Sequence, residues 1–382
     1  MSTITFTNGR VVLADTVIDG WVSIEDGRIQ GVGPGQPSAT LTRTHDLGGD
    51  MLIPGLVELH TDHMEQHLQP RPRVHWPERS AIMAFDAQVA ASGITTVFDC
   101  VRAGNDADYA KQKGEITSVV RAVSEAMDAG LLRADHRIHL RCEVCADDVL
   151  SETKAVIENP HVGLISLMDH TPGARQFIDI EQWRTYYGGK SGLSNDQLDR
   201  LIKDKRAQFD RNYLQNRSAI VRLARQMNVK VASHDDATEA HVHEALEDQV
   251  AIAEFPTTEE AARLSHAAGI SVLMGAPNVV RGGSHSGNIA AEQLARLGYL
   301  DVLSSDYVPA SLLLAAFILA DRINDFDLPR ALATVTSTPA NAVGLHDRGT
   351  IAEGLRGDVV RVALVDSAPV VREVYREGQR VC

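Results

Sequence analysis

The residues best suited to chemistry are a histidine and a carboxylate that stand two positions apart after an apolar run. His60 and Asp62 close the segment Met51-Leu-Ile-Pro-Gly-Leu-Val-Glu-Leu-His60-Thr-Asp62. On a β-strand, side chains at positions i and i+2 leave the same face, so both groups should point at one place beyond the strand end. Imidazole and carboxylate together suit a divalent metal ion of borderline or hard character. The pair therefore predicts a metal-dependent hydrolase.

Further metal-capable side chains end other apolar runs in the same way: Glu143, His170, His234 and Asp306. In a barrel of parallel strands such ends converge on one face. Taken singly, each residue is more often a structural group or a helix cap, but the joint pattern favours metal binding. We expect Glu143 to bridge two divalent ions. We expect Asp306 to be a ligand, and also the general base that takes a proton from the attacking water.

Two histidines extend the first motif, at positions 63 and 67. If a helix begins after Asp62, their i,i+4 spacing places His63 and His67 on one helix face. They are then alternative ligands, substrate contacts or plain surface residues, and we count His67 among the substrate contacts. The sequence leaves open whether Asp62 or His63 is the ligand of the first strand.

The elements that must position these residues alternate between strands and helices. Apolar runs rich in Val, Ile and Leu are typical of strands buried on both faces. They occur at 52–60, 93–100, 137–144, 162–169, 229–234, 250–255, 270–275 and 300–305, with amphipathic helices expected at 116–129 and 216–227. This alternation predicts an α/β fold with a (β/α)8 TIM-like barrel.

Both ends of the chain read as short strands separated by turns such as Asn8-Gly9 and Asp26-Gly27. We therefore predict a small β-sandwich domain from residues 1–52 and 346–382, and a barrel from residues 53–345. The polar segment 179–212 does not fit a minimal barrel and reads as an insertion, either a lid or a surface excursion. Within it, Ser194 is the expected start of a helix.

The composition bounds the partners and the compartment. Lys and Arg total 37 against 51 for Asp and Glu, a net charge of −14, which disfavours binding to nucleic acid. No apolar stretch reaches the roughly 18 residues of a membrane helix, and the N-terminus does not resemble a signal peptide. The 4 cysteines are too sparse for a disulfide framework. We expect a cytoplasmic protein without a membrane partner, and the sequence allows a homo-oligomer.

Cationic residues gather in segments that should lie near the strand ends. Arg71 and Arg73 stand in a proline-rich stretch after the first strand, and Arg175 follows His170 closely. A glycine-rich stretch after the seventh strand carries Asn278, Arg281 and His285. Guanidinium forks and glycine-lined backbone N–H groups suit phosphate, so these residues are predicted to bind an anionic, phosphorylated substrate.

Two of these segments, Pro54–Asp62 and Ser304–Asp306, resemble the motifs of the amidohydrolase superfamily. The resemblance implies a barrel with metal ligands at its strand ends and a small β domain built from both termini. The chain departs from the superfamily pattern in two places. Asp62 stands where a second histidine is usual, and Glu143 stands where many members carry a carboxylated lysine.

A closer resemblance is to the diphosphatases of phosphonate metabolism, in segments that span nearly the whole barrel: 60–67, 139–144, 167–177, 233–238, 275–288 and 304–309. These enzymes split pyrophosphate from a ribose 5-triphosphate that carries a phosphonate at C1. The resemblance implies a metal-activated water that attacks the α-phosphorus and leaves a 5-phosphate. It also implies two divalent ions, with zinc expected and manganese or iron as alternatives.

Two other functions compete with this interpretation. One is another amidohydrolase reaction, on an amide, a cyclic imide or an N-acetyl aminosugar, for which fewer cationic contacts are needed. The other is a non-catalytic binding protein on the same fold, which the full set of ligand-type residues disfavours.

Overall fold

A computed structural model gives the fold and describes residues 3–37, 43–105, 115–175, 180–181, 183–185, 194–284 and 287–382. The chain divides into two compact units. The first unit comprises Met1–Asp99, Glu125–Arg137 and Met274–Cys382, and the second comprises Cys100–Ser124 and Ile138–Leu273. These units divide the sequence differently from the expected domains 1–52 with 346–382 and 53–345, and those domain boundaries stay a prediction.

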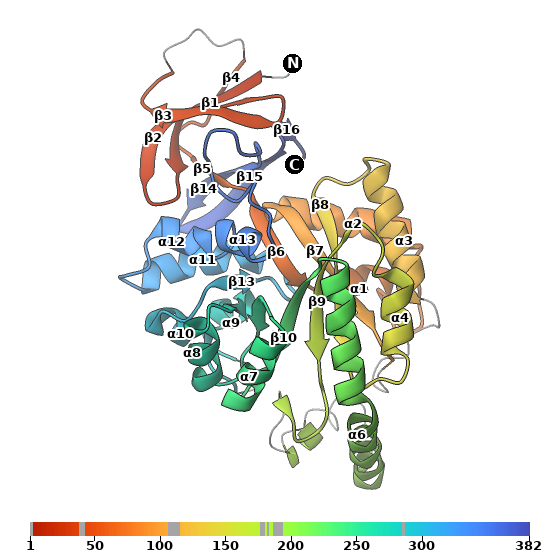
Figure 1. Cartoon of the computed structure of the whole chain (residues 1–382). Coiled ribbons are helices and arrows are strands. Elements are labelled where there is room, and N and C mark those ends of the chain that lie inside the picture. The colour runs from red at the N-terminus through yellow and green to blue at the C-terminus, as the bar shows by residue number, and fades with distance from the viewer. Residues whose placement is uncertain are drawn as a thin grey trace. The chain divides into compact units, whose positions relative to one another are not determined.

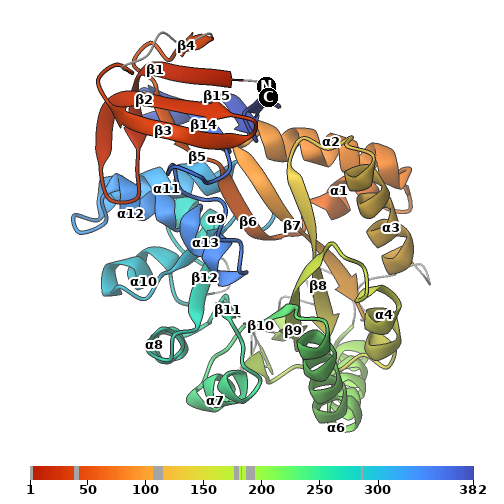
Figure 2. The same cartoon turned by 45° about the horizontal axis from the view of Figure 1, so that its top comes forward.

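In the first unit, strands from both ends of the chain form one sheet (Figures 1 and 2). Its order within the described residues is β16-β15-β14-β5-β1-β2-β3, with β4 beside β1. The strands are β1 (Thr3–Val12), β2 (Val17–Glu25), β3 (Arg28–Pro34), β4 (Thr44–Asp46), β5 (Met51–Pro54), β14 (Val359–Val365), β15 (Ala368–Arg376) and β16 (Gln379–Arg380). Phe6 is fully buried in the core of this sheet and packs edge-on against Tyr375, near the other end of the sequence. The prediction of a small β domain from both termini is confirmed.

The second sheet is the predicted barrel. Its strands follow one another in chain order, from β6 to β13, within the part of the chain that the structure describes. They are β6 (Leu56–Thr61), β7 (Ile94–Ala103), β8 (Asp135–Glu143), β9 (Val162–Met168), β10 (Lys230–His234), β11 (Ile252–Glu254), β12 (Ser271–Gly275) and β13 (Val302–Ser304). The pairings β6–β7, β8–β9, β9–β10, β10–β11 and β11–β12 are parallel. A bridge between Thr61 and Asp306 joins the first strand to the segment after the last.

The expected strand 52–60 is in fact two strands. β5 belongs to the terminal sheet and β6 to the barrel, and Gly55 stands between them. A Cβ at Gly55 would lie 2.2 Å from the Thr95 hydroxyl, so only glycine fits at this crossing. The apolar run is continuous because β5 and β6 are both buried, which is why the break does not show in the hydrophobic pattern.

The helices with the clearest amphipathic pattern are found where they were expected. Helix α3 (Glu115–Asp128) matches the expected 116–129, whereas the expected 216–227 is only the last part of the 32-residue helix α6 (Asn195–Gln226). Ser194 begins α6 with a capping box that involves Gln197. Of the helices in the described residues, none combines the length and apolar character needed to cross a membrane.

The remaining helices are α1 (Met64–Leu68), α2 (Glu78–Ala91), α4 (Val149–Val156), α7 (Glu239–Glu247), α8 (Glu259–Ala267), α9 (Ala276–Arg281), α10 (Ala291–Leu297), α11 (Ser311–Arg322), α12 (Leu328–Ala333) and α13 (Ser337–Ala342). Helix α9 occupies the first half of the segment that we expected to be a glycine-rich loop. Pro277 favours this helix because its fixed φ suits the first turn, and Gly282 ends it in a left-handed conformation.

Candidate active site

In the first unit, three of the predicted site residues meet where β6 and β13 end. The backbone N–H of Asp306 donates to the carbonyl of His60 (3.1 Å), and the N–H of Asp62 donates to the carbonyl of Asp306 (3.2 Å). Asp306 has a φ of 54°, a left-handed conformation that is uncommon for aspartate. The structure therefore brings the predicted base and the predicted first-strand ligands together, with the backbone at Asp306 turned sharply.

The buried carboxyl group of Glu58 links the ends of the same two strands. Glu58 has no exposed surface, and its two oxygens accept the backbone N–H groups of His60 (2.6 Å) and Ser305 (2.5 Å). Burial raises the pKa of Glu58 to about 8, although these hydrogen bonds oppose the shift. Glu58 therefore connects His60, near the end of β6, to Ser305, just after β13. Sequence reasoning missed it, although its i,i+2 relation to His60 was a usable signal.

The histidines after Asp62 are occupied by protein partners. His63 Nδ1 lies 2.9 Å from the carbonyl oxygen of Tyr307, and its Nε2 lies 3.0 Å from the side-chain amide of Gln88. His67 Nε2 lies 3.2 Å from the same amide. A carbonyl oxygen can only accept, so His63 Nδ1 is the donor in the first contact. His63 Nδ1 thus ties the first turn after β6 to the segment that follows Asp306, and its Nε2 ties the same turn to Gln88 of α2.

In the second unit, Glu143 is the last residue of β8, and its side chain lies between Arg102 and His170. Its Oε1 accepts from Arg102 Nη1 (2.8 Å) and its Oε2 from His170 Nδ1 (2.8 Å). Burial would raise the pKa of Glu143, but His170 and then Arg102 outweigh burial and hold that pKa well below its usual range. Glu143 is therefore a carboxylate at neutral pH, and it fixes the orientation of His170.

The second unit also contains residues that fit a metal ion. His170, His234 and Asp235 each offer one ligand atom, and these atoms lie within 4.8 Å of one another. Because His170 Nδ1 faces Glu143, its Nε2 is left for a metal ion, an arrangement typical of metal-binding histidines. His234 Nδ1 lies 2.9 Å from Asp235. Two imidazoles and a carboxylate suit a borderline divalent ion such as zinc. Sequence reasoning did not single out Asp235.

Arg175 is placed differently from what its expected role requires. It is 2% exposed, and its guanidinium makes ion pairs with Asp236 and Glu244 (2.6 Å to the latter) and donates to the Tyr213 hydroxyl (2.8 Å). Two carboxylates and a phenol therefore surround this cation inside the unit. Arg175 as a direct substrate contact stays a prediction, and the structure gives it an internal set of partners.

The other predicted substrate contacts differ in their exposure. Arg71, Arg73 and Arg281 are exposed. Asn278 is half-buried, and its side-chain oxygen accepts the N–H of Ala291, which ties α9 to the start of α10. His285 lies outside the described residues. The three arginine side chains are thus exposed to solvent, and their role in phosphate recognition stays a prediction.

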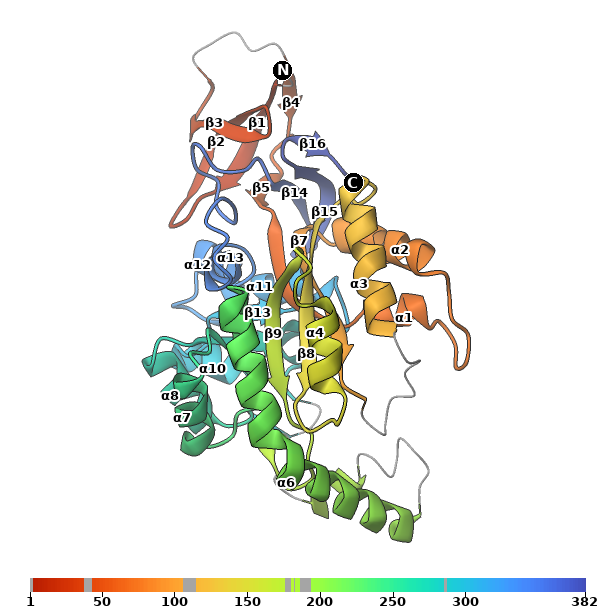
Figure 3. The ribbon, with the colours of Figure 1, turned by 45° about the vertical axis from the view of Figure 1, so that its right-hand side comes forward.

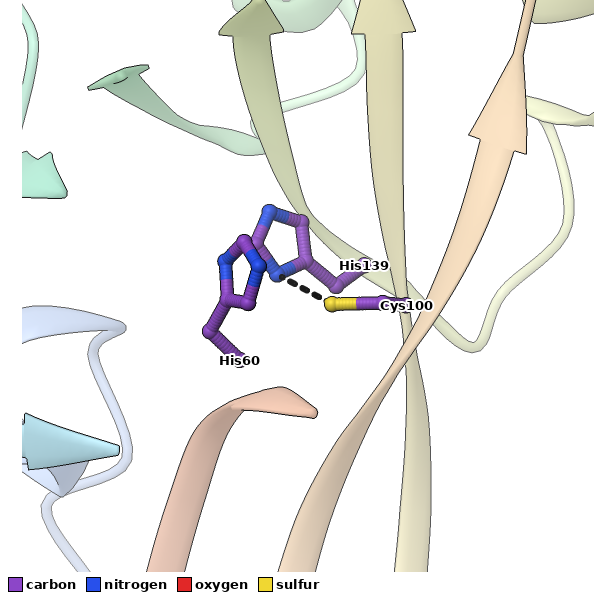
Figure 4. Close-up of side chains that lie close together, drawn as sticks. All are labelled: His60, Cys100 and His139. Carbon is purple, nitrogen blue, oxygen red and sulfur yellow. Dashed lines mark hydrogen bonds between the residues drawn. The ribbon is translucent and has the colours of Figure 1, made fainter. Parts of the chain in front are cut away.

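A second network of buried hydrogen bonds lies in the interior of the second unit. Cys100 Sγ lies 3.6 Å from His139 Nδ1 (Figure 4), and His139 Nε2 is bonded to the Ser166 hydroxyl. Ser166 in turn donates to Glu254 (2.6 Å), so its oxygen accepts from His139 Nε2 and the Cys100 thiol donates to Nδ1. This chain fixes the tautomer of His139, and all four side chains are buried.

Comparison with known proteins gives a consistent set of relatives. The amidohydrolase family model matches residues 179–382. The alpha-D-ribose 1-methylphosphonate 5-triphosphate diphosphatase of Escherichia coli (strain K12) is 45% identical over 375 residues, covering 98% of this chain and 99% of the relative. An imidazolonepropionase of Deinococcus deserti is 23% identical over 394 residues, covering 95% and 92%. The solved N-acetyl-D-glucosamine-6-phosphate deacetylase of Mycobacterium smegmatis superposes with a TM-score of 0.66 at 18% identity, covers 100% of both chains, and shows the fold alone.

Proposed function

This chain belongs to the amidohydrolase family, and from that premise we propose that it is a metal-dependent hydrolase that releases pyrophosphate from alpha-D-ribose 1-methylphosphonate 5-triphosphate. The observation that carries the proposal is the 45% identity, over 98% of this chain, to the Escherichia coli enzyme of that name. Identity at this level over nearly the full length supports carrying the activity named for that enzyme over to this chain. The retained product is the 5-phosphate.

The reaction is a hydrolysis at the α-phosphorus. A water oxygen forms the new bond to this phosphorus, and the bond between the α-phosphorus and the oxygen that bridges to the β-phosphorus breaks. Pyrophosphate leaves with that bridging oxygen. We propose that Asp306 accepts the proton of the attacking water. Its backbone is held by hydrogen bonds to His60 and Asp62.

We propose that the ligands are His60, Asp62, Glu143, His170, His234 and Asp306. When bound there, divalent ions would supply Lewis-acid polarisation of a phosphoryl oxygen and lower the pKa of a water. Each oxygen of Glu143 accepts one hydrogen bond and keeps a second lone pair, so its contacts with Arg102 and His170 are compatible with a ligand role. Both ring nitrogens of His63 have protein partners, which favours Asp62 over His63.

We propose that the site binds two divalent ions, with zinc expected and manganese or iron as alternatives. The mixture of imidazole and carboxylate side chains supports this proposal, because both ligand types suit these ions. Metal analysis of protein purified without chelator tests both the identity and the number of ions. Cytoplasmic localisation and the domain boundaries given above belong to the same proposal.

Phosphorus NMR of the metal-loaded protein with the ribose triphosphate tests the reaction. The expected spectrum loses the triphosphate resonances and gains those of pyrophosphate and a phosphomonoester, while the phosphonate resonance persists. Orthophosphate as the first product would indicate attack at the γ-phosphorus and contradict the proposal. No change in the spectrum with metal-loaded protein would favour an amide, cyclic-imide or N-acetyl aminosugar substrate, or a non-catalytic protein.

A further inference from the structure

Arg175 connects the two segments that carry the proposed metal ligands His170 and His234. It stands five residues after His170, and its guanidinium makes an ion pair with Asp236, two residues after His234. Arg175 is 2% exposed and Asp236 is 1% exposed, so salt and water screen this pair only weakly. The ion pair therefore links the chain after one histidine to the chain after the other.

Asp236 ends a tight turn that contains the second histidine. Its carboxylate accepts from the Ser233 hydroxyl (2.5 Å), and its carbonyl oxygen accepts from the N–H of Thr257 (2.9 Å). Asp235 has a φ of 56°, a left-handed conformation, and its carboxylate lies 2.9 Å from His234 Nδ1. Asp236 thus closes the turn 233–236, and its position determines where the backbone of His234 lies.

Two helices also hold the guanidinium of Arg175. Its Nη2 donates to Glu244 of α7 (2.6 Å) and to the Tyr213 hydroxyl of α6 (2.8 Å). Helix α6 packs against α4 and extends beyond it (Figure 3), which fixes Tyr213 in the second unit. A guanidinium can make these bonds and the pair with Asp236 at once, because its five N–H groups point in fixed directions. Arg175 therefore anchors the turn 233–236 to both helices.

The two histidines that these segments carry lie close enough to share one ion. The ring centroids of His170 and His234 are 6.0 Å apart, and one ligand atom from each, with one from Asp235, lie within 4.8 Å of one another. This distance depends on how the two segments are placed, and a metal ion tolerates only small errors in it. Glu143 orients His170. The corresponding link for the turn 233–236 is the one through Arg175.

We infer that Arg175 is a positioning residue, which holds the turn 233–236 at the distance from His170 that a metal ion requires. The inference rests on the proposed metal-dependent hydrolysis and adds a role that the sequence motifs do not indicate. It differs from the predicted direct contact with the substrate in what it affects. A positioning residue changes metal binding and kcat, whereas a substrate contact changes KM.

The test compares Arg175→Lys with Arg217→Lys. Arg217 is also buried and shares two partners with Arg175, the Tyr213 hydroxyl and Glu244. Its further partner is Asp248 (2.6 Å), which follows α7. A lysine keeps the charge but replaces the fork by one compact ammonium group, so Arg175→Lys cannot hold both ends of the link. Zinc affinity, measured by competition with a chromogenic chelator, should fall about tenfold in Arg175→Lys and stay unchanged in Arg217→Lys.

Cobalt(II) provides a readout that a purely structural role would not change. It accepts the same imidazole and carboxylate ligands as zinc and absorbs visible light, so its spectrum reports the ligand geometry. The spectrum should change in Arg175→Lys and match wild type in Arg217→Lys. Steady-state kinetics of the zinc-saturated proteins should show a lower kcat for Arg175→Lys with KM unchanged.

Unchanged zinc affinity and an unchanged cobalt spectrum in Arg175→Lys would overturn the inference, and a raised KM alone would then make Arg175 a substrate contact. Equal losses in both lysine variants would also overturn it, because they would indicate a structural role of the whole network. If Arg175→Lys does not fold, Asp236→Asn breaks the same ion pair and should show the same losses, with Asp248→Asn as its control. The metal measurements need no substrate, so wild-type protein that binds zinc but releases no pyrophosphate would contradict the proposed reaction alone.

Discussion

A histidine buried between two carboxylates in the first unit should make the protein less stable at alkaline pH. His136 Nδ1 lies 2.8 Å from Asp99, and its Nε2 lies 3.2 Å from Asp86, with all three side chains fully buried. Burial disfavours the charged imidazolium, but Asp99 and Asp86 together outweigh burial and raise the pKa of His136 to about 9. His136 is therefore cationic at neutral pH in the folded protein.

The size and sign of the effect follow from this shift. A histidine side chain in the unfolded chain titrates near its ordinary pKa of 6.5, so the folded protein raises the pKa of His136 by about 2.5. At about 1.4 kcal/mol for each pH unit, the charged ring contributes about 3 kcal/mol to the free energy of unfolding. Because the folded pKa is raised, this contribution is fully present below pH 6.5 and is lost as the pH rises through 9.

Urea unfolding followed by circular dichroism at about pH 6.5, 8 and 9.5 measures the effect, with Asp99→Asn as the perturbation. Removing the Asp99 charge lowers the pKa of His136, so the difference in unfolding free energy between wild type and variant should shrink as the pH rises. Asp15→Asn, an exposed position, is the control and should follow wild type at every pH. A difference between wild type and Asp99→Asn that stays constant across this pH range would refute the charged state of His136.

Four shorter predictions concern the site. Asp306→Asn should lower kcat by about 100-fold or more with metal retained, and near-wild-type kcat would exclude Asp306 as the base. Glu58→Gln should lower the unfolding free energy by about 1–3 kcal/mol in urea, because one buried N–H loses its acceptor. Alanine at Arg71, Arg73 and Arg281 together should raise KM for the triphosphate; full activity would contradict phosphate recognition there. Chelator treatment should abolish activity, and added zinc should restore it; activity that survives would exclude metal dependence.

Most of the barrel strands could be predicted because they are apolar runs rich in Val, Ile and Leu, although β8 carries polar residues along its length. A strand buried on both faces needs no polar positions, so composition alone marks it. The limits of this signal appear at Gly55, where two buried strands of different sheets follow each other without a polar break. Only the close approach of Thr95 requires the glycine, and that contact depends on the fold.

Helix α6 shows a different limit of sequence reasoning. Its first half was expected to be part of an insertion, because that half is polar and offers few apolar residues to a core. The structure instead gives one helix from Asn195 to Gln226, begun by the predicted cap at Ser194. Its first half packs Leu198 and Ile202 against the buried Trp183, and the amides of Asn212 and Asn216 add hydrogen bonds to backbone carbonyls. Polar docking of this kind is invisible to a pattern that counts only apolar residues.

The cations of the second unit show why nearness to a strand end is an incomplete guide to substrate contacts. Arg175 stands five residues after a predicted ligand, yet Asp236 and Glu244 surround its guanidinium. Lys205 is distant in sequence from every predicted ligand, yet it lines a small pocket together with Glu143 and His170. An arginine matched by internal carboxylates stabilises the unit, and its place soon after a strand end does not by itself make it a substrate contact. Assigning the substrate contacts of this chain therefore requires the pairing of its charges, which only the fold determines.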